Sequence, residues 1–234
     1  MRDNHGMAAA RISVVIPARD EEALLARAVG SVETDAEVIV VDGCSSDRTR
    51  EVAASRGALV LSSPPSRGVQ LEAGVGRARG DWLVFLHADT WLEEGWAEAI
   101  RALEAGVVGG AFRFAIDAPG RGYRLLETAV ALRCAILRLP YGDQALFVRR
   151  TALDRVGGIA PLPLMEDVDL ARRLGREGCL AFLAPRAFTS PRRWDRYGLV
   201  GATLRNWCVL ALYAAGVPPA RLARLYAPPK AGPS

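Results

Sequence analysis

Short apolar runs alternate with segments of helical spacing through the first hundred residues, and this alternation constrains the fold more than any other feature. The runs end at turn residues, as buried strands do, and they cover residues 12–16, 38–41, 59–61 and 82–86. Helical spacing follows over residues 21–32, 46–56, 69–78 and 90–105. Thr90 and Glu93 stand at capping-box spacing and predict the start of the last helix. Repeated strand–helix units predict parallel strands joined by right-handed crossovers, hence a doubly wound α/β sheet.

The pattern loosens in the second half of the chain. Strand-like alternation returns at residues 112–116 and 145–148, and we expect helices at 123–138, 166–176 and 199–215. Because neither a linker nor an internal repeat interrupts the chain, we expect one domain over residues 11–234 with a helical extension from about residue 195. Residues 1–10 are expected to form a disordered leader.

Composition excludes some classes of partner. The 234 residues carry a formal net charge of +4, and Lys230 is the only lysine. Arginine suits bidentate binding of phosphate or carboxylate, although codon preference would produce the same bias. The basic residues are dispersed without interleaved aromatic residues, which argues against a nucleic-acid partner. The four cysteines form no CxxC pair, so neither a zinc site nor a disulfide framework is indicated, and a cytoplasmic location is expected.

Two apolar segments bear on membrane contact. Residues 207–220 and 123–139 come nearest to the roughly 18–20 uncharged residues that a membrane span needs, but glycine, proline or charged residues interrupt them. Both are typical of buried or amphipathic helices. Packing is the favoured interpretation; peripheral contact with the inner face of a membrane stays open, as does the oligomeric state.

Two of the apolar runs lead into an aspartate, Asp42 and Asp89. Ligands of open α/β sheets bind along the carboxyl edge of the strands, so two acids at this edge favour a nucleotide site with a metal. Carboxylate oxygens are the ligands that Mg²⁺ and Mn²⁺ prefer. The alternative is that each aspartate only caps a turn, which is common for one such residue but less so for a pair.

Several motifs resemble, in the same order, those of glycosyltransferase family 2. SVVIPARDEE at 13–22 is similar to the family's strand followed by P-x-x-N-E, and DGCSSDRT at 42–49 is similar to D-[DG]-G-S-x-D-x-T. RGVQLEAG at 67–74 resembles the element that ends in N-x-G or A-G. His87-Ala88-Asp89 falls where the family has D-x-D, and GG at 157–158 with EDVDLARR at 166–173 resembles GG-[FI]…ED-x-D-L-x-x-R. The resemblance covers residues 11–183 and is nearest to short bacterial members with H-A-D.

The resemblance implies a GT-A fold, a Rossmann-like and mostly parallel central sheet with flanking helices, followed here by C-terminal helices. It also implies a hexosyltransferase that uses a nucleotide sugar, most commonly a UDP-sugar, with Mn²⁺ or Mg²⁺. Asp89 with His87 would hold the metal, and Asp167, with Glu166 as the alternative, would be the general base. The residues that would contact the nucleotide sugar are Pro17, Arg19, Glu21, Asp42, Arg67 and Ala88.

Three residues depart from the family pattern. Asp20 replaces the usual asparagine, which affects the detail of base recognition. Cys44 replaces glycine after Asp42, so a turn with positive φ would be strained there. His87 replaces the first acid of D-x-D; a neutral imidazole still ligates Mn²⁺, but Asp89 then carries most of the ionic attraction.

Two further groups are candidates for contact with the sugar or the diphosphate. Arg192 and Arg193 are suited to clamp a leaving diphosphate, and Trp194 to stack on a sugar. A solvated basic turn with a packing tryptophan explains these residues equally well. Asp143, within Gly142-Asp143-Gln144, is a candidate for contact with the sugar or the acceptor.

An inverting transfer to an acceptor hydroxyl requires a base, which is the role expected of the acid pair at residues 166–167. Acids at a helix start are also favoured by the helix dipole alone. The rival functions are a retaining GT-A transferase of the kind that glycosylates phosphoglycerate, a polyprenyl-phosphate sugar synthase, and a catalytically silent nucleotide-sugar-binding protein. A dehydrogenase is disfavoured because no G-x-G-x-x-G follows the first strand, and a nucleotidyltransferase because the Gly-rich loop with Arg and Lys is absent. The acceptor stays unknown.

Overall fold

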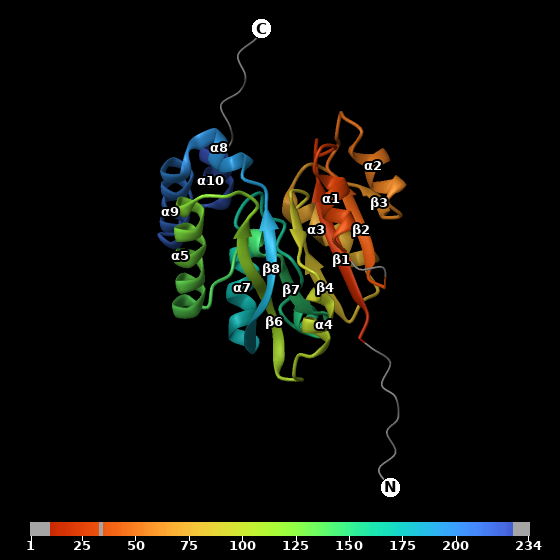
Figure 1. Cartoon of the computed structure of the whole chain (residues 1–234). Coiled ribbons are helices and arrows are strands. Elements are labelled where there is room, and N and C mark those ends of the chain that lie inside the picture. Colours follow the sequence, from red (N-terminus) through yellow and green to blue (C-terminus); the bar gives the residue numbers. More distant parts are fainter. Residues whose placement is uncertain (1–9, 33–34, 227–234) are drawn as a thin grey trace.

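A computed structural model describes residues 10–32 and 35–226, so the expected leader lies almost wholly outside the described residues. The described strands form one eight-stranded sheet in the order β3-β2-β1-β4-β7-β6-β8-β5 (Figure 1). The fold is therefore of the mixed α/β kind that the alternating pattern predicted.

The first four strands are parallel and stand where the apolar runs predicted them. They are β1 (Ile12–Ala18), β2 (Glu37–Asp42), β3 (Leu59–Ser62) and β4 (Trp82–Phe85). Three helices connect them: α1 (Leu25–Gly30), α2 (Thr49–Ser55) and α3 (Arg67–Arg77). Since the strands are parallel, their carboxyl ends meet at one edge of the sheet, where ligands of such sheets bind.

The second half of the sheet is mixed. β7 (Leu146–Arg149) runs antiparallel to β4 and to β6 (Val107–Ile116), β6 pairs in parallel with β8 (Cys179–Thr189), and β5 (Thr90–Leu92) pairs antiparallel with β8. The helices that accompany these strands are α4 (Trp96–Arg101), α6 (Arg150–Arg155) and α7 (Glu166–Glu177).

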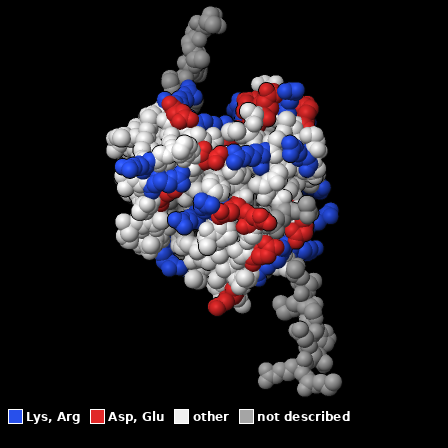
Figure 2. All heavy atoms as spheres, in the orientation of Figure 1, with Lys and Arg blue, Asp and Glu red and all other residues white. Residues whose placement is uncertain are grey.

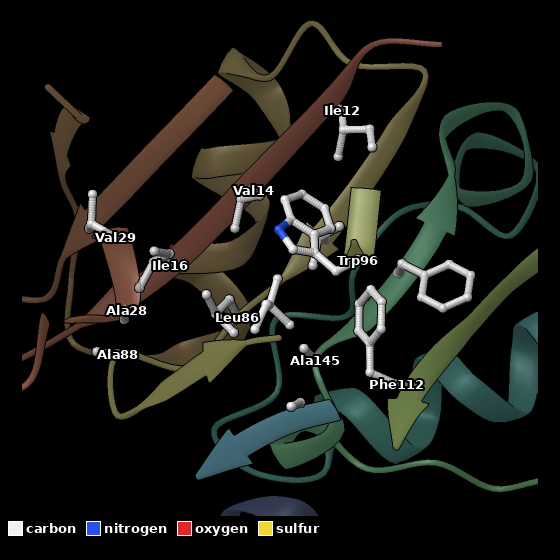
Figure 3. Packing of buried hydrophobic residues seen from close by; sticks show 14 of the residues in the cluster. Ile12, Val14, Ile16, Ala28, Val29, Leu86, Ala88, Trp96, Phe112 and Ala145 are labelled. Atoms are coloured by element: carbon white, nitrogen blue, oxygen red, sulfur yellow. The ribbon is translucent and has the colours of Figure 1, made fainter. Parts of the chain in front are cut away.

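Helices cover both faces of the sheet. Along β1, Val14 and Ile16 pack in a cluster with residues of α1, α2 and α4, whereas Val15 packs on the opposite face with residues of α3, α6 and α7. Figure 3 shows the first cluster, in which the Trp96 and Phe112 rings lie 6.3 Å apart in an edge-to-face arrangement. Successive residues of a strand point to opposite faces, so one apolar run supplies both cores.

Two predictions of local structure are wrong. Thr90 does not cap a helix: it begins β5, and its hydroxyl lies 3.3 Å from that of Thr189 on β8. Glu93 is paired with Arg186 instead of capping, and α4 begins only after Gly95, whose φ is 83°. The pairing of β5 with β8, which depends on residues a hundred positions apart, prevailed over the local signal.

Strand β8 was not predicted at all. It contains Pro185 and few β-branched residues, a composition that disfavours a central strand. The pairing of β6 with β8 shifts register between Phe112 and Arg113, whose partners are Leu183 and Arg186. This bulge leaves Pro185 out of the ladder, so its missing N–H costs no sheet hydrogen bond.

Four helices gather at one end of the molecule (Figure 1): α5 (Arg121–Leu137), α8 (Arg192–Tyr197), α9 (Leu199–Ala214) and α10 (Pro219–Tyr226). Phe114 and Ile116 of β6 pack there against Trp194 and Ala202, forming a third apolar cluster. Within residues 10–32 and 35–226, no helix is both long and apolar enough to cross a membrane.

Candidate active site

The first part of the candidate site is the edge where β1 and β2 end, at which the sequence predicts a nucleotide. Asp42 is 2% exposed, and its two carboxylate oxygens each lie 3.3 Å from the backbone N–H of Ser45. The turn does require positive φ, because Cys44 has a φ of 62° where the family has glycine. A left-handed conformation costs a residue with a Cβ on the order of 1–2 kcal/mol, so the turn is held by its surroundings.

The start of α3 braces this edge. Gln70 Nε2 donates to the carbonyl of Ala18 at 3.0 Å and to that of Val41 at 2.8 Å, which ties the ends of β1 and β2 together. Gly68 lies so close to the backbone of residues 160–162 that an added Cβ would stand 2.6 Å from the carbonyl oxygen of Ala160. The segment before α7 is therefore packed directly on α3.

A cavity of about 590 Å³ opens beside this edge. Its polar wall contains carboxylates and guanidinium groups from five different elements or loops. The wall consists of Arg19, Arg67, His87, Tyr141, Asp143, Glu166, Asp167 and Arg193. Its apolar wall is formed by Pro163, Leu164, Met165, Val168, Val209 and Leu210, with Asn206 beside them. Seven of the residues that the sequence predicted for one site thus meet in one cavity, although they are up to 174 positions apart. Glu21, Asp89 and Arg192 do not line it.

Not all predicted residues line this cavity. Pro17 lines a small pocket beneath it, together with Arg67 and Asp167. Ala88 is buried in the core, and Asp42 lies under the turn at the end of β2. Trp194 is buried against Phe114 at 6.1 Å between ring centroids, as the packing interpretation expected.

Arg192 lies between the two acids nearest the expected metal site. Its Nε donates to Asp89 Oδ2 at 3.0 Å, and its Nη1 donates to Glu21 Oε2 at 2.7 Å. Burial raises the pKa of Glu21, and the pairing with Arg192 opposes that shift. The guanidinium therefore supplies positive charge where the sequence predicts a divalent cation.

The H-A-D segment offers two metal donors of different kinds. Burial lowers the pKa of His87 well below its ordinary value, and the nearby Arg67 and Arg193 lower it further, so the imidazole is neutral and able to ligate. Asp89 provides the anionic oxygen. Within the described residues no group of three or more His, Cys, Asp or Glu side chains is arranged around one point. A carboxylate and an imidazole fit an open Mn²⁺ or Mg²⁺ site in which substrate phosphates and water supply the remaining ligands.

The acid pair at the start of α7 occupies two distinct environments. Glu166 is 2% exposed, lies 3.5 Å from Arg67 Nε, and has its pKa raised to about 7 by burial, against the opposing effect of Arg67. Asp167 Oδ2 accepts the backbone N–H of Gly142 at 2.6 Å, and its Oδ1 accepts that of Val168 at 2.7 Å. Asp167 is thus oriented by amide donors, whereas Glu166 is buried against an arginine.

Gly142 lies between His87 of the H-A-D segment and Asp167 of the acid pair. It begins the short 3₁₀ helix η1 (Gly142–Gln144), and a Cβ added to it would stand 2.7 Å from His87 Nε2 and 3.0 Å from Asp167 Oδ2. Only the lack of a side chain lets both groups approach. The sequence points to the segment GDQ through Asp143 but carries no signal for this role of Gly142.

Asp143 itself faces the cavity. Burial raises its pKa, against the nearby Arg193 and Arg133, and its Oδ1 is buried without a hydrogen-bond partner among the described residues. Tyr141 lines the same wall, with the Arg133 guanidinium 3.6 Å from its ring centroid. Nothing in the sequence pattern indicated that Tyr141, Arg133 or Asn206 belongs here, since none falls in a recognised motif.

Comparison with known proteins decides the family. The family model described as "Glycosyl transferase family 2" matches residues 13–163. The chain belongs to glycosyltransferase family 2. It is accordingly a glycosyltransferase, an enzyme that transfers a hexose, and its eight-stranded sheet with flanking helices is the GT-A fold.

Several solved family structures are similar. Glucosyl-3-phosphoglycerate synthase from Mycobacterium tuberculosis, in complex with Mn²⁺, UDP and glucosyl-3-phosphoglycerate, is 25% identical, with 89% of this chain and 81% of that chain covered and a TM-score of 0.59. TarS from S. aureus in complex with UDP-GlcNAc is 15% identical (77% and 58% covered, TM-score 0.57). The mannosyltransferase PcManGT from Pyrobaculum calidifontis, in complex with GDP-Man and Mn²⁺, is 17% identical (78% and 57% covered, TM-score 0.56). The last two show the fold alone.

A curated relative shares part of the sequence. A TPR repeat-containing protein of Synechococcus elongatus is 36% identical over 97 residues, which are 40% of this chain and 24% of that protein. The match therefore spans about a quarter of the relative's length.

Proposed function

We propose that this family 2 enzyme transfers a hexose from a UDP-sugar to an acceptor hydroxyl with inversion at the anomeric carbon, and that it depends on Mn²⁺ or Mg²⁺. The observation that carries the proposal is the cavity that Asp167 lines together with Arg19, Arg67 and Arg193. Arginines suit an anionic diphosphate, and an oriented carboxylate suits the removal of a hydroxyl proton. The similar glucosyl-3-phosphoglycerate synthase, 25% identical to this chain, was solved with UDP and Mn²⁺ bound, which supports a UDP-sugar donor and a divalent cation.

In the proposed reaction, each of the residues in the site has a separate role. Asp167, oriented by the Gly142 N–H, takes the acceptor's proton as the acceptor oxygen forms its bond to the anomeric carbon. The bond from that carbon to the diphosphate breaks at the same time, and Arg192 and Arg193 stabilise the departing charge. A cation held by Asp89 and His87 would supply further compensation for that charge. Asp42 and Glu21 would contact the nucleoside.

Donor binding and chemistry can be tested separately. A panel of UDP- and GDP-sugars with Mn²⁺ or Mg²⁺ is screened by thermal shift and by slow donor hydrolysis, and a UDP-sugar should give the largest effect. Asp167→Asn should leave donor affinity unchanged while kcat falls by about 10²–10⁴-fold. Asp154→Asn, at an exposed carboxylate in α6, is the matched control and should change neither. Full turnover of Asp167→Asn would move the base elsewhere.

The remaining alternatives differ in observable product. The similarity to glucosyl-3-phosphoglycerate synthase favours a retaining transferase as the second candidate. A retaining transferase gives the opposite anomer, which NMR of the product distinguishes. A silent sugar-nucleotide-binding protein would give the thermal shift without transfer or hydrolysis.

The cysteines in the described part of the chain, Cys44, Cys134, Cys179 and Cys208, are unpaired, and we propose a reducing, cytoplasmic location for the enzyme.

A further inference from the structure

The helices at the C-terminal end expose apolar side chains in stripes. On α5, Leu125, Leu132 and Ile136 stand seven and four residues apart, and they are 60–71% exposed. On α9, Val200, Leu204 and Trp207 stand four and three residues apart and are 54–69% exposed. Residues at these spacings share one face of a helix. Each helix therefore has one face in the core and a second, apolar face in solvent.

The stripes belong to one continuous surface, which we call the helical face: the exposed sides of α5, α9 and α10. Gly122 of α5 is so close to α9 that an added Cβ would stand 2.7 Å from Leu199 Cδ2. Arg205 of α9 donates to the backbone carbonyl of Leu225 on α10 at 3.3 Å, and Leu225 is itself 65% exposed. Figure 1 shows the three helices side by side at this end of the molecule.

The charged residues of the helical face are almost all arginine. Arg121 stands four residues before Leu125 on α5, and Arg221 four residues before Leu225 on α10, so each extends an apolar stripe. On α9, Arg205 is half-buried and its guanidinium lies 5.0 Å from the centroid of the Tyr197 ring, so the exposed basic charge comes from α5 and α10. Figure 2 shows basic side chains spaced among uncharged ones at this end.

The acids of these helices are already engaged. Glu127 accepts the backbone N–H of Ile116 at 2.7 Å and is paired with Arg124 at 2.8 Å. Asp195 accepts the Tyr123 hydroxyl at 3.3 Å. The outward face therefore combines leucine, isoleucine and tryptophan with arginine, which is the composition of helices that lie in a membrane interface.

We infer that the helical face docks on the surface of an anionic lipid bilayer, with α5, α9 and α10 lying flat on it. The apolar stripes enter the headgroup region, and the arginines contact lipid phosphates. A second copy of the chain fits less well, because a two-fold interface would bring the same arginines against each other. The inference goes beyond the proposed transfer, since it concerns where the enzyme works.

Docking would set the orientation of the active site. α9 contributes Asn206, Val209 and Leu210 to the wall of the cavity on its inner side and Leu204 and Trp207 to the helical face on its outer side. A narrow groove between α5 and α9 shares Tyr141, Asp143 and Asn206 with that cavity. The cavity would therefore lie one helix away from the lipid, with the wall formed by α9 toward it.

The test is sedimentation of the full chain with vesicles, without donor or acceptor. The chain should sediment with vesicles of phosphatidylcholine and phosphatidylglycerol, much less with phosphatidylcholine alone, and less at high salt. Leu132→Gln with Leu204→Gln should lower the partition coefficient at least about ten-fold, because two buried alkyl groups are lost. Arg121→Gln with Arg221→Gln should lower it on anionic vesicles only.

The matched control replaces Leu59 and Phe182, which are exposed apolar residues outside the helical face, by glutamine. It should bind anionic vesicles as the wild type does. Thermal unfolding and donor hydrolysis of every variant check that the fold and the active site are intact, so a failed docking proposal is distinguishable from a failed assignment of function. Unchanged binding of the leucine pair variant, or no binding of the wild type to anionic vesicles, would overturn the inference. A wild-type dimer that this variant dissociates would also overturn it, in favour of a second copy.

Discussion

Gly142→Ala tests whether the close approach of His87 and Asp167 matters for catalysis. The new Cβ would stand 2.7 Å from His87 Nε2 and 3.0 Å from Asp167 Oδ2. Ordinary non-bonded separations are roughly 3.5–4.0 Å, so the imidazole must retreat by about 1 Å and the carboxylate by slightly less. The peptide N–H that Asp167 accepts is retained, so the substitution displaces the two side chains without deleting a hydrogen-bonding group.

The size of the effect follows from that displacement. Moving a catalytic group by about 1 Å can reduce the rate about 10²-fold, and we expect a fall of that order in kcat. Crowding of a packed site typically costs about 1–3 kcal/mol, so the free energy of unfolding should also decrease. Nucleoside affinity should change little, because the added Cβ meets His87 and Asp167 and not Asp42.

The assay compares Gly142→Ala with Gly76→Ala. An added Cβ at Gly76, in α3, meets nothing within 4 Å, so this control should keep the wild-type kcat and gain about 0.5–1 kcal/mol of stability. Transfer rates, donor dissociation constants and urea unfolding are measured for both. Wild-type kcat in a stably folded Gly142→Ala enzyme would refute the reasoning, because it would show that neither side chain needs its present position.

The other predictions concern charge. Asp89→Ala should abolish the metal-dependent part of donor binding in calorimetry; affinity unaffected by removal of the metal in the wild type would contradict this. Arg192→Gln should tighten binding of Mn²⁺ alone, since it frees Asp89 and Glu21, while slowing transfer; weaker Mn²⁺ binding would count against competition between the guanidinium and the cation. Asp42→Ala should weaken every nucleotide sugar in the panel alike, and a selective loss would argue against a nucleoside contact. Burial raises the pKa of Glu166 from 4.5 to about 7, so between these pH values the folded state keeps a proton that the unfolded state releases. The free energy of unfolding should therefore fall as pH rises through this interval, by on the order of 3 kcal/mol. Glu166→Gln should remove that fall in urea titrations at pH values below and above the interval.

The sequence predicted the parts of the fold that depend on local pattern. Strands β1 to β4 are confirmed, and β1 and β4 were the easiest to predict because a strand buried on both faces needs a continuous apolar run. β8 could not be predicted, because a strand tolerates Pro185 only where a bulge removes it from the hydrogen-bonded ladder. That bulge arises from the pairing with β6, which local sequence does not show. Thr90 was assigned to a helix because a capping signal cannot report a partner as distant as Thr189.

The candidate site, too, could be predicted from the sequence only in part. The motifs predicted that Arg67, His87, Glu166 and Asp167 share one site, and they line one cavity. The pairing of Arg192 with acids 103 and 171 positions away could not be predicted, because it depends on where β8 ends and α8 begins.

The brace that Gln70 and Gly68 form has a mechanical consequence. Through Gln70, α3 fixes the turn on which a nucleoside would rest, and through Gly68 it is pressed against the segment that leads into the acid pair. The turn after β2 and the segment before Glu166 and Asp167 are thus both held by α3, which keeps the distance between them constant. A movement that admits a sugar nucleotide would then involve α8, which the side chain of Arg192 joins to Glu21 and Asp89.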